Sequence, residues 1–476
     1  MMDSGKNVLA QKTVGTWELV FQGMGQITPI TILAGLIVSI VSFSLVAAPL
    51  AMIISFVAVL MAANTIYQFS GKVAHAGGYY AYVEHGLGKA MGKFTGMQYI
   101  LYQVSNLGLE YLIVIWGFSK SLNYAFGTSL PAWTGVIWMG SMIALSFVLM
   151  IRGAKPSLRL ALILGAIQVF FVIILSLIIV PLAPDNTASA FAPSAASGGW
   201  TGVFLGFIVG GYLAFAGYGS IVPMGEEAMS PRKTIRKALV IIVLIAGLVF
   251  VLGSYAMIVG FGTSSLSTFS TVVIPGLVVA KRFVGVAGAV VFIVINTFLS
   301  TYGTVVGMGT PLTRVMFALG RDNVLDERLS KVNKHGVPMN SIYATYGITI
   351  LAALAMGGIF YVYYGFYNGL YYAWVIFGTI ATLATLFIHI LSNSSLTVLN
   401  FREKAKSKLL TWVVLPIATT ALMIVAYYYS LLGITMPFLI APIIFVAWIA
   451  ISAVITYHYR FTTKAIDFQK MDMEND

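Results

Sequence analysis

The sequence alternates between long apolar stretches and short polar ones along its whole length. Each apolar stretch has about 20 residues or more, which is the length that a helix needs to cross the roughly 30 Å hydrocarbon core of a bilayer. We therefore predict an all-α polytopic membrane protein with about twelve transmembrane helices. The predicted spans are 17–38, 45–70, 94–119, 132–151, 158–181, 200–228, 238–261, 284–310, 339–359, 366–391, 409–432 and 434–458. Because their number is even, we expect both termini on the same side of the membrane.

The polar stretches differ in charge on the two sides of the membrane. The chain has 27 Lys and Arg residues and a formal net charge of +12, and all of these cations except Lys120, Lys281 and Arg282 fall on the side of the N-terminus. Cytoplasmic loops of membrane proteins carry an excess of Lys and Arg. The pattern predicts a multi-pass protein of the cell membrane with both termini in the cytoplasm, and it accounts for the positive charge without a nucleic-acid partner.

The composition argues against a cofactor, a metal site or an enzyme. The chain has no cysteine and only five histidines, and charged residues make up 9% of it. The histidines are scattered, whereas a membrane enzyme needs a cluster of His, Asp, Glu or Arg at one depth. We expect His75 and His85 to lie on the surface and His389 to lie at the membrane interface.

Two segments share the pattern F-x-G-x-G-x-I-x-P, and they are Phe21 to Pro29 and Phe215 to Pro223. Closely spaced glycines followed by a proline do not favour a continuous helix. The segments lie in the first and sixth predicted spans, which cross the membrane in opposite directions. Since unwound backbone in a membrane must be buried in protein or line a wet cavity, paired breaks predict a polar site at mid-membrane. The alternative is that both are kinks packed by small residues.

Four further stretches carry a family resemblance. They are Ala76 to Tyr82 (A-G-G-Y-Y-A-Y), Ala214 to Tyr218 continued by Gly225 to Pro231, Arg314 to Asp322 (R-V-M-F-A-L-G-R-D), and Gly378-Thr379. In this order they resemble the amino acid/polyamine/organocation (APC) superfamily of transporters. The resemblance implies alternating access and a substrate that is an amino acid or a related amine, moved with a coupling proton or by exchange.

The resemblance also implies how the chain is divided. A first five-helix repeat would span 1–182, a second and inverted repeat would span 183–400, and two added helices with the C-terminus would span 401–476. The substrate would lie between the two broken helices. The implied substrate-binding residues are Gly23, Met24, Gly25, Gln26, Ile27, Thr28, Phe215, Ala216, Gly217, Tyr218, Gly219 and Ser220.

Three positions depart from the family pattern. Pro29 has no N–H to offer to a carboxylate, Gln168 stands where proton-coupled members often have a lysine, and Gly219 stands where some members have an acid. The resemblance therefore predicts the place of the site and leaves its ligand and its coupling ion open.

Several polar residues in or near the spans are candidates for gating or coupling. They are Tyr102, Asn106, Glu110, Gln168, Glu226, Glu227, Thr301 and Thr304. An acid inside a membrane is a functional candidate by default, although Glu110 could instead be wetted near the outer end of its helix. Glu226 and Glu227 could form salt bridges that close a cytoplasmic gate, or an ordinary solvated charge cluster.

Other functions remain as alternatives. Thr301 and Thr304 could hold sodium in a sodium-coupled carrier, although such hydroxyls usually bond to their own helix. A transporter with two six-helix halves would have its breaks elsewhere. A channel would more often be built by symmetry around a shared pore, so one chain with two broken helices favours a carrier.

Overall fold

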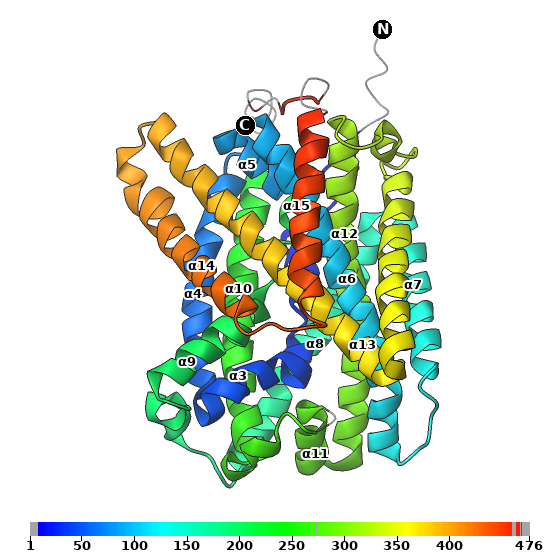
Figure 1. Cartoon of the computed structure of the whole chain (residues 1–476), viewed down its shortest axis with the longest axis vertical. Coiled ribbons are helices and arrows are strands. Elements are labelled where there is room, and N and C mark those ends of the chain that lie inside the picture. The colour runs from blue at the N-terminus through cyan, green and yellow to red at the C-terminus, as the bar shows by residue number, and fades with distance from the viewer. Residues whose placement is uncertain (1–7, 273, 459–462, 467, 469–476) are drawn as a thin grey trace.

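The computed structural model describes residues 8–272, 274–458, 463–466 and 468, and these residues are almost entirely helical (Figure 1). Its described part contains no β-strand, and its single isolated bridge pairs Val14 with Ala228. Eight continuous helical segments in this part are long and apolar enough to cross a membrane. The prediction of an all-α polytopic membrane protein is thus confirmed.

Most helices follow the predicted spans, with longer ends in several cases, whereas in the predicted span 200–228 the continuous helix ends at Phe215. The first part of the chain forms α1 (Thr16–Ile27), α2 (Pro29–Thr31), the π-helical η1 (Ile32–Leu36), α3 (Ile37–Ser44), α4 (Ala48–Ser70), α5 (Tyr79–Leu87), α6 (Lys89–Phe126), α7 (Thr134–Ile151) and α8 (Ala154–Leu182). The rest forms α9 (Trp200–Gly206), the π-helical η5 (Phe207–Gly211), the 3-10 turn η6 (Leu213–Phe215), α10 (Pro231–Phe261), α11 (Pro275–Ile293), the π-helical η9 (Val294–Ser300), α12 (Thr301–Arg321), α13 (Met339–Arg402), α14 (Leu415–Leu431) and α15 (Ile440–His458).

Two glycines bend helices close to the ends of predicted spans. Gly365 has φ 76° and ψ 176° inside α13, so the helix turns between the predicted spans 339–359 and 366–391. Gly285 has φ 68° inside α11, and the part of α11 before it lies on the face of the molecule opposite the described chain ends (Figure 1).

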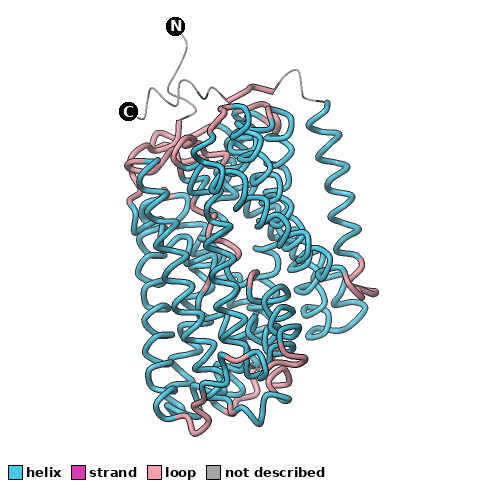
Figure 2. Tube along the Cα trace, turned by 90° about the vertical axis from the view of Figure 1, so that its left-hand side faces the viewer, coloured by secondary structure: helices cyan, strands magenta, loops and turns pink. Residues whose placement is uncertain are grey.

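The centre and the edge of the bundle differ in burial. Every residue of α12 from Thr301 to Gly320 is buried, whereas α7, α14 and α15 each bury only four residues. Figure 2 shows α15 at the edge of the molecule. The peripheral helices expose apolar side chains, as expected for surfaces in contact with lipid.

Helix α6 occupies the interior although it is not among the eight apolar segments. It carries Lys93, Gln103 and Glu110, and all three are buried. It packs against α5, α12 and α13. A polar transmembrane helix is tolerated when neighbouring helices shield it from lipid, so α6 can supply polar side chains to a buried site.

The described chain ends lie on one side of the molecule, which we call the terminal face. The start of α1 and the end of α15 both lie there (Figure 1). Both end segments form backbone hydrogen bonds there. The N–H of Thr13 donates to the carbonyl oxygen of Glu227 at 2.9 Å, and the N–H of Lys464 donates to the carbonyl oxygen of Asp322 at 3.0 Å. Residues 1–7 and 469–476 lie outside the described residues, and the orientation of this face toward the cytoplasm remains a prediction.

Candidate substrate site and charged cluster

The first helix break is shorter than the sequence predicts. We expected the break to extend from Gly23 to Pro29, but α1 remains helical through Ile27. Thr28 alone leaves the helix, with φ 50° and ψ 76°, and Pro29 begins the next turn. Proline suits the first position of a helix because its missing N–H would have no partner there.

Gly23 and Gly25 serve packing instead. A Cβ atom at Gly23 would lie 2.5 Å from the Cδ1 atom of Ile242 in α10, and one at Gly25 would lie 2.7 Å from the carbonyl oxygen of Gly303 in α12. Small residues let membrane helices approach closely. For these two glycines, the alternative of close packing in a helix therefore describes the structure better than a break.

The second break is extensive. The 3-10 turn at Phe215 ends in Ala216, which has φ −55° and ψ 125°, and no α-helix follows until Pro231. Gly217 has φ 118°, a backbone conformation that an L-residue rarely adopts. A Cβ atom at Gly217 would lie 2.7 Å from the Cγ atom of Gln26, so this glycine also allows the close approach of the two breaks.

Side-chain amides connect the two breaks. The Nε2 atom of Gln22 donates to the carbonyl oxygen of Gly307 at 3.2 Å and lies 3.5 Å from that of Ser220. Gln26 donates to the hydroxyl of Tyr102 at 3.0 Å and forms a reciprocal amide pair with Gln103, with distances of 3.3 and 3.2 Å. The structure thus brings Gln26, Gly217 and Tyr102 together, while the contribution of Gln103 was not predicted.

A small cavity lies beside the second break. Its lining residues are Tyr79, Tyr99, Tyr102, Gly217, Gly219, Ser220, Thr385, Ile388 and His389. Its volume is about 10 Å³, far below the range of roughly 300–1,000 Å³ that is typical of small-molecule pockets. The site is therefore tightly closed in this conformation.

Five of the lining residues were not predicted to be there, and they are Tyr79, Tyr99, Thr385, Ile388 and His389. His389 is only 9% exposed, and its ring lies 5.6 Å from that of Tyr218 and 5.2 Å from that of Tyr79. The predicted interfacial position of His389 is wrong, because the α13 face that carries it turns inward. Tyr79 belongs to the A-G-G-Y-Y-A-Y stretch, and its hydroxyl reaches the space above Gly219, where a Cβ atom would lie 1.7 Å from it.

Other predicted residues lie outside the cavity. Phe215 packs against Phe56 and Phe250, with ring centroids 6.4 and 4.9 Å apart. Asn106 donates to the carbonyl oxygen of Tyr102 on its own helix at 3.0 Å. Glu110 is buried one turn farther along α6. The structure does not place these side chains at the cavity wall.

The predicted sodium hydroxyls bond to their own helix. Thr301 donates to the carbonyl oxygen of Thr297 at 2.8 Å, and Thr304 donates to that of Ser300 at 2.9 Å. Gln168 is fully buried, and neither polar atom of its amide has a hydrogen-bond partner among the described residues. Its Nε2 atom would lie 3.6 Å from a Cβ atom at Gly303, so Gln168 faces the crossing of α1 and α12.

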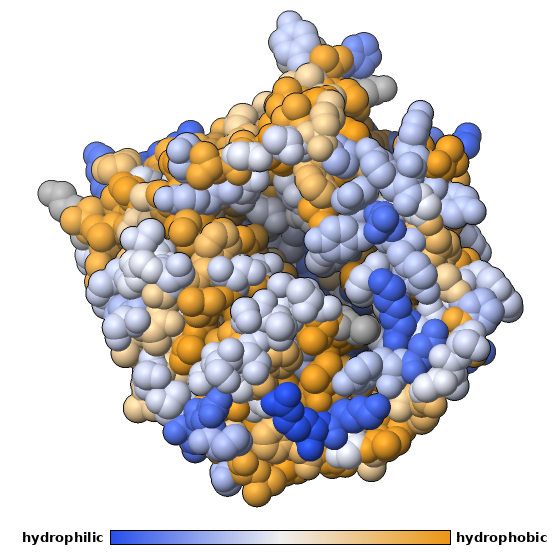
Figure 3. Space-filling model, turned by 60° about the horizontal axis from the view of Figure 1, so that its bottom comes forward, coloured by the Kyte–Doolittle hydropathy of each residue, from blue (hydrophilic) through white to orange (hydrophobic). Residues whose placement is uncertain are grey.

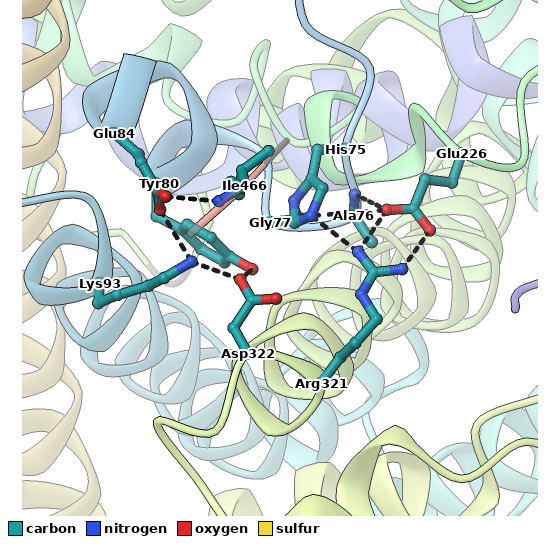
Figure 4. A network of polar contacts seen from close by, with 10 residues as sticks. All are labelled: His75, Ala76, Gly77, Tyr80, Glu84, Lys93, Glu226, Arg321, Asp322 and Ile466. Carbon is teal, nitrogen blue, oxygen red and sulfur yellow. Dashed lines mark hydrogen bonds and ion pairs between the residues drawn. The ribbon is translucent and has the colours of Figure 1, made fainter. Parts of the chain in front are cut away.

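Toward the terminal face, charged residues form two linked groups that we call the gate cluster (Figure 4). In the first group, Arg321 donates to both carboxylate oxygens of Glu226 at 2.7 and 2.9 Å. The backbone N–H of Ala76 donates to the same carboxylate at 2.8 Å. His75 is 5% exposed, and its Nε2 atom lies 2.8 Å from a guanidinium nitrogen of Arg321. The prediction that His75 lies on the surface is wrong.

The second group surrounds a buried lysine. Lys93 is 1% exposed and forms ion pairs with Asp322 and, at 2.8 Å, with Glu84. The hydroxyl of Tyr80 donates to Asp322 at 2.9 Å, and the ammonium group of Lys93 lies 4.7 Å from the centre of the Tyr80 ring. The sequence analysis gave these residues no role, although Tyr80 and Asp322 lie in the stretches that carry the family resemblance.

Comparison with known proteins identifies the family. The family model of the amino acid permeases matches residues 18–473. The chain belongs to this family. The chain is also similar to a branched-chain amino acid permease of Lactococcus lactis, with 26% identity over 65% of this chain and 66% of the relative. A second branched-chain amino acid permease, from Bacillus subtilis, is 25% identical over 70% of this chain and 72% of its own length. A probable amino-acid permease of Schizosaccharomyces pombe is 29% identical over 34% of this chain and 32% of the relative.

Burial and charge shift the pKa values of groups in the gate cluster of this permease. Burial by itself raises the pKa of Glu226, but the adjacent Arg321 guanidinium outweighs it and lowers the pKa to about 2. Burial, with help from Arg321, lowers the pKa of His75 from 6.5 to about 4. Burial raises the pKa of Glu84, and Lys93 opposes that shift. Glu226 is therefore ionised and His75 neutral at pH 7.

A third group, the buried pair of Glu227 and Arg314, also belongs to the gate cluster. Glu227 accepts hydrogen bonds from Arg314 at 2.8 and 3.0 Å, and both residues are buried. Buried and bidentate pairs of this kind differ from the solvated charge cluster that was the alternative prediction. Glu226 and Glu227 thus bind arginines of the Arg314 to Asp322 stretch, so three stretches that carry the family resemblance meet in this cluster.

Proposed function

We propose that this permease is a secondary active transporter that carries amino acids across the cell membrane by alternating access. The observation that carries the proposal is the meeting of two broken helices, at Thr28 and at Ala216 to Ser220, beside a closed cavity. Half-helix ends and unwound backbone are the elements with which such transporters bind the charged groups of a substrate. The substrate would lie between Gln26, Gly217 and the cavity.

The chemistry of the cavity favours a neutral substrate. Among the described lining residues there is no carboxylate, lysine or arginine to pair with a charged side chain. Tyrosine rings and Ile388 supply apolar surface instead. Together with the names of the two bacterial relatives, this supports an amino acid with a branched apolar side chain as the substrate.

Alternating access requires that one side is closed while the other is open. The gate cluster buries its ion pairs between the cavity and the terminal face, and Figure 3 shows a hollow in the opposite face. We infer that this conformation is closed toward the cytoplasm, and that the repeats 1–182 and 183–400 move against each other to reverse it. Breaking the buried pairs would be part of the cost of that movement.

Uptake into proteoliposomes tests the proposal. We expect purified protein to transport radiolabelled leucine, isoleucine and valine, and to leave lysine and glutamate outside. The assay is run with no gradient, with a proton gradient and with a sodium gradient, to identify the driving ion. Failure to transport any amino acid would refute the proposed function, and discrete conductance steps in planar bilayers would identify a channel instead.

A further inference from the structure

His389 is a buried side chain whose polar atoms have no partner in the closed cavity. It is 9% exposed, and its ring lies between the rings of Tyr218 and Tyr79. No described residue forms a hydrogen bond or an ion pair with its ring nitrogens. Histidines that serve only packing usually direct at least one ring nitrogen to a protein partner. An unpartnered imidazole at a cavity wall favours a ligand in the cavity.

Ser220 provides a second polar group of this kind in the same cavity. It is 3% exposed, it lies in the unwound part of the second break, and its Oγ atom has no hydrogen-bond partner among the described residues. It lines the same cavity as His389. Buried polar groups in proteins are almost always paired, so two unpaired groups around one cavity indicate a polar subsite that a substrate completes.

The surroundings of His389 contain no fixed charge. The titratable groups that face the cavity are the phenols of Tyr79 from α5, of Tyr99 and Tyr102 from α6, and of Tyr218 from the second break. One turn farther along α13, Asn393 bonds to Thr65 of α4 and to Thr419 of α14, and none of the three titrates. The gate cluster pairs its charges internally and does not line the cavity.

Among the described lining residues, His389 is the one of a type that, in its unperturbed form, changes charge between about pH 5 and 8. The position where some family members carry a lysine holds Gln168, whose amide does not titrate. An imidazolium ion in this cavity would have no carboxylate to balance it, except one that a substrate brings. A proton on His389 and a zwitterionic amino acid would thus stabilise each other.

We propose that His389 contacts the transported amino acid and carries the coupling proton. While the cavity is open to the outer solution, a hydronium ion gives its proton to a ring nitrogen, and the imidazolium pairs with the substrate carboxylate. After the cavity opens to the terminal face, the substrate leaves, the proton passes from the ring to water, and neutral imidazole returns. The inference rests on the proposed function, and it adds a coupling residue and the coupling ion to it.

A pair of assays with His389→Gln tests this role. Glutamine retains hydrogen-bonding groups but cannot take up a proton. In proteoliposomes with an alkaline interior, we expect the wild type to accumulate leucine, and we expect the variant to lose that accumulation by about tenfold or more. Exchange of internal for external leucine needs no net proton movement, so the variant should lose less exchange than accumulation, and the lost contact with the substrate should raise the leucine concentration needed for half-maximal exchange. The control is His335→Gln, because His335 is exposed in the loop between α12 and α13.

The possible outcomes separate the two proposals. If the wild type transports no amino acid, the proposed function fails. If it transports leucine without moving protons, as read with a pH dye inside the vesicles, only the coupling inference fails. Accumulation by His389→Gln at the wild-type level would also overturn the inference. A variant that does not fold would be recognised by its elution profile in size-exclusion chromatography. In that case the accumulation assay is repeated with His389→Asn, and the dye measurement on the wild type shows whether protons move with leucine.

Discussion

At the scale of single residues, the site depends on positions where a side chain has no room. Gly217 combines φ 118° with a close approach to Gln26, and Gly219 leaves space for the hydroxyl of Tyr79. Both glycines are in the second break, where the backbone passes between side chains from α1 and α5. Gly23 and Gly25, which precede the first break, have helical backbone and instead allow α1 to pack closely against α10 and α12.

Gly217→Ala should impair transport strongly. The left-handed conformation costs an L-residue about 1–2 kcal/mol, and the new methyl group would overlap Gln26, whose amide joins the two breaks. We expect leucine uptake to fall by about tenfold or more at equal protein density in the vesicles. Gly347→Ala is the matched control, since Gly347 is exposed on α13 and has no atom within 4 Å of the added Cβ position. Equal uptake by the two variants would contradict this account.

Acid on the terminal face should open the gate cluster through His75. In the closed state its pKa is about 4, compared with 6.5 for an ordinary histidine, so the closed state binds fewer protons than a state in which His75 is wetted. The closed state is therefore fully favoured above about pH 6.5 and loses stability as the pH falls toward 4. Glu226, with a pKa of about 2, stays ionised over this range.

Cysteine labelling measures this opening, because the natural chain contains no cysteine. With a single reporter, Ile388→Cys, we expect labelling from the terminal face to become about tenfold faster between about pH 7.5 and 5.5, after correction for the reactivity of the thiol itself. His75→Gln should remove the dependence. If the labelling rate of His75→Gln still depends on pH, another group is responsible for the opening.

At the scale of helices, the crossing of α1 and α12 holds the first break in place. Gly25 and Gly303 face each other there, and a Cβ atom at Gly307 would lie 2.6 Å from the backbone nitrogen of Gln26. A backbone neighbour cannot rotate away as a side chain can. The position of Gln26, and with it the link to Tyr102, therefore depends on a helix far away in the sequence.

Gly307→Ala should consequently separate the two helices. Overpacking costs about 1–3 kcal/mol, and we expect a thermal unfolding midpoint in detergent that is lower by several degrees, together with weaker leucine binding. Gly309→Ala on the same helix is the control, because its added Cβ would lie 3.7 Å from the Sδ atom of Met150, an ordinary contact. If both variants melt like the wild type, the crossing is looser than the structure indicates.

At the scale of the whole molecule, the segment after α15 reaches back to the gate cluster. The backbone N–H of Ile466 donates to Glu84 at 2.8 Å (Figure 4), that of Lys464 donates to Asp322 at 3.0 Å, and Lys89 donates to the carbonyl oxygen of Thr463 at 3.0 Å. Glu84 and Asp322 are the two carboxylates that hold Lys93. The segment therefore braces the gate cluster.

Removal of residues 463–476 should make the terminal face open more readily. Glu84 and the Asp322 carbonyl group would lose the hydrogen bonds that Ile466 and Lys464 donate, and we expect faster labelling of the Ile388→Cys reporter from that face. Lys464→Ala should label like the parent, because the contact at this position uses the backbone N–H, which alanine retains. Unchanged labelling after truncation would show that the ion pairs alone keep the face closed.

Much of the architecture follows from local sequence. Most of the predicted spans fall on observed helices because an apolar run of sufficient length has no stable place outside a membrane or a protein core. The second break was predicted because Gly217 and Pro223 act on their own backbone. The first break was predicted too wide, since the glycines in Phe21 to Pro29 looked alike locally but differ in their neighbours.

The sequence by itself determined the helical membrane architecture and the two places where helices break, because chain length, apolarity and backbone chemistry act over a few residues. Only the tertiary structure decided what surrounds those places. His389 became a cavity residue and His75 a buried one because helices distant in sequence pack around them. Lys93 forms ion pairs with Glu84 and Asp322 for the same reason. Burial and partnership are properties of packing between helices, and no local pattern contains them.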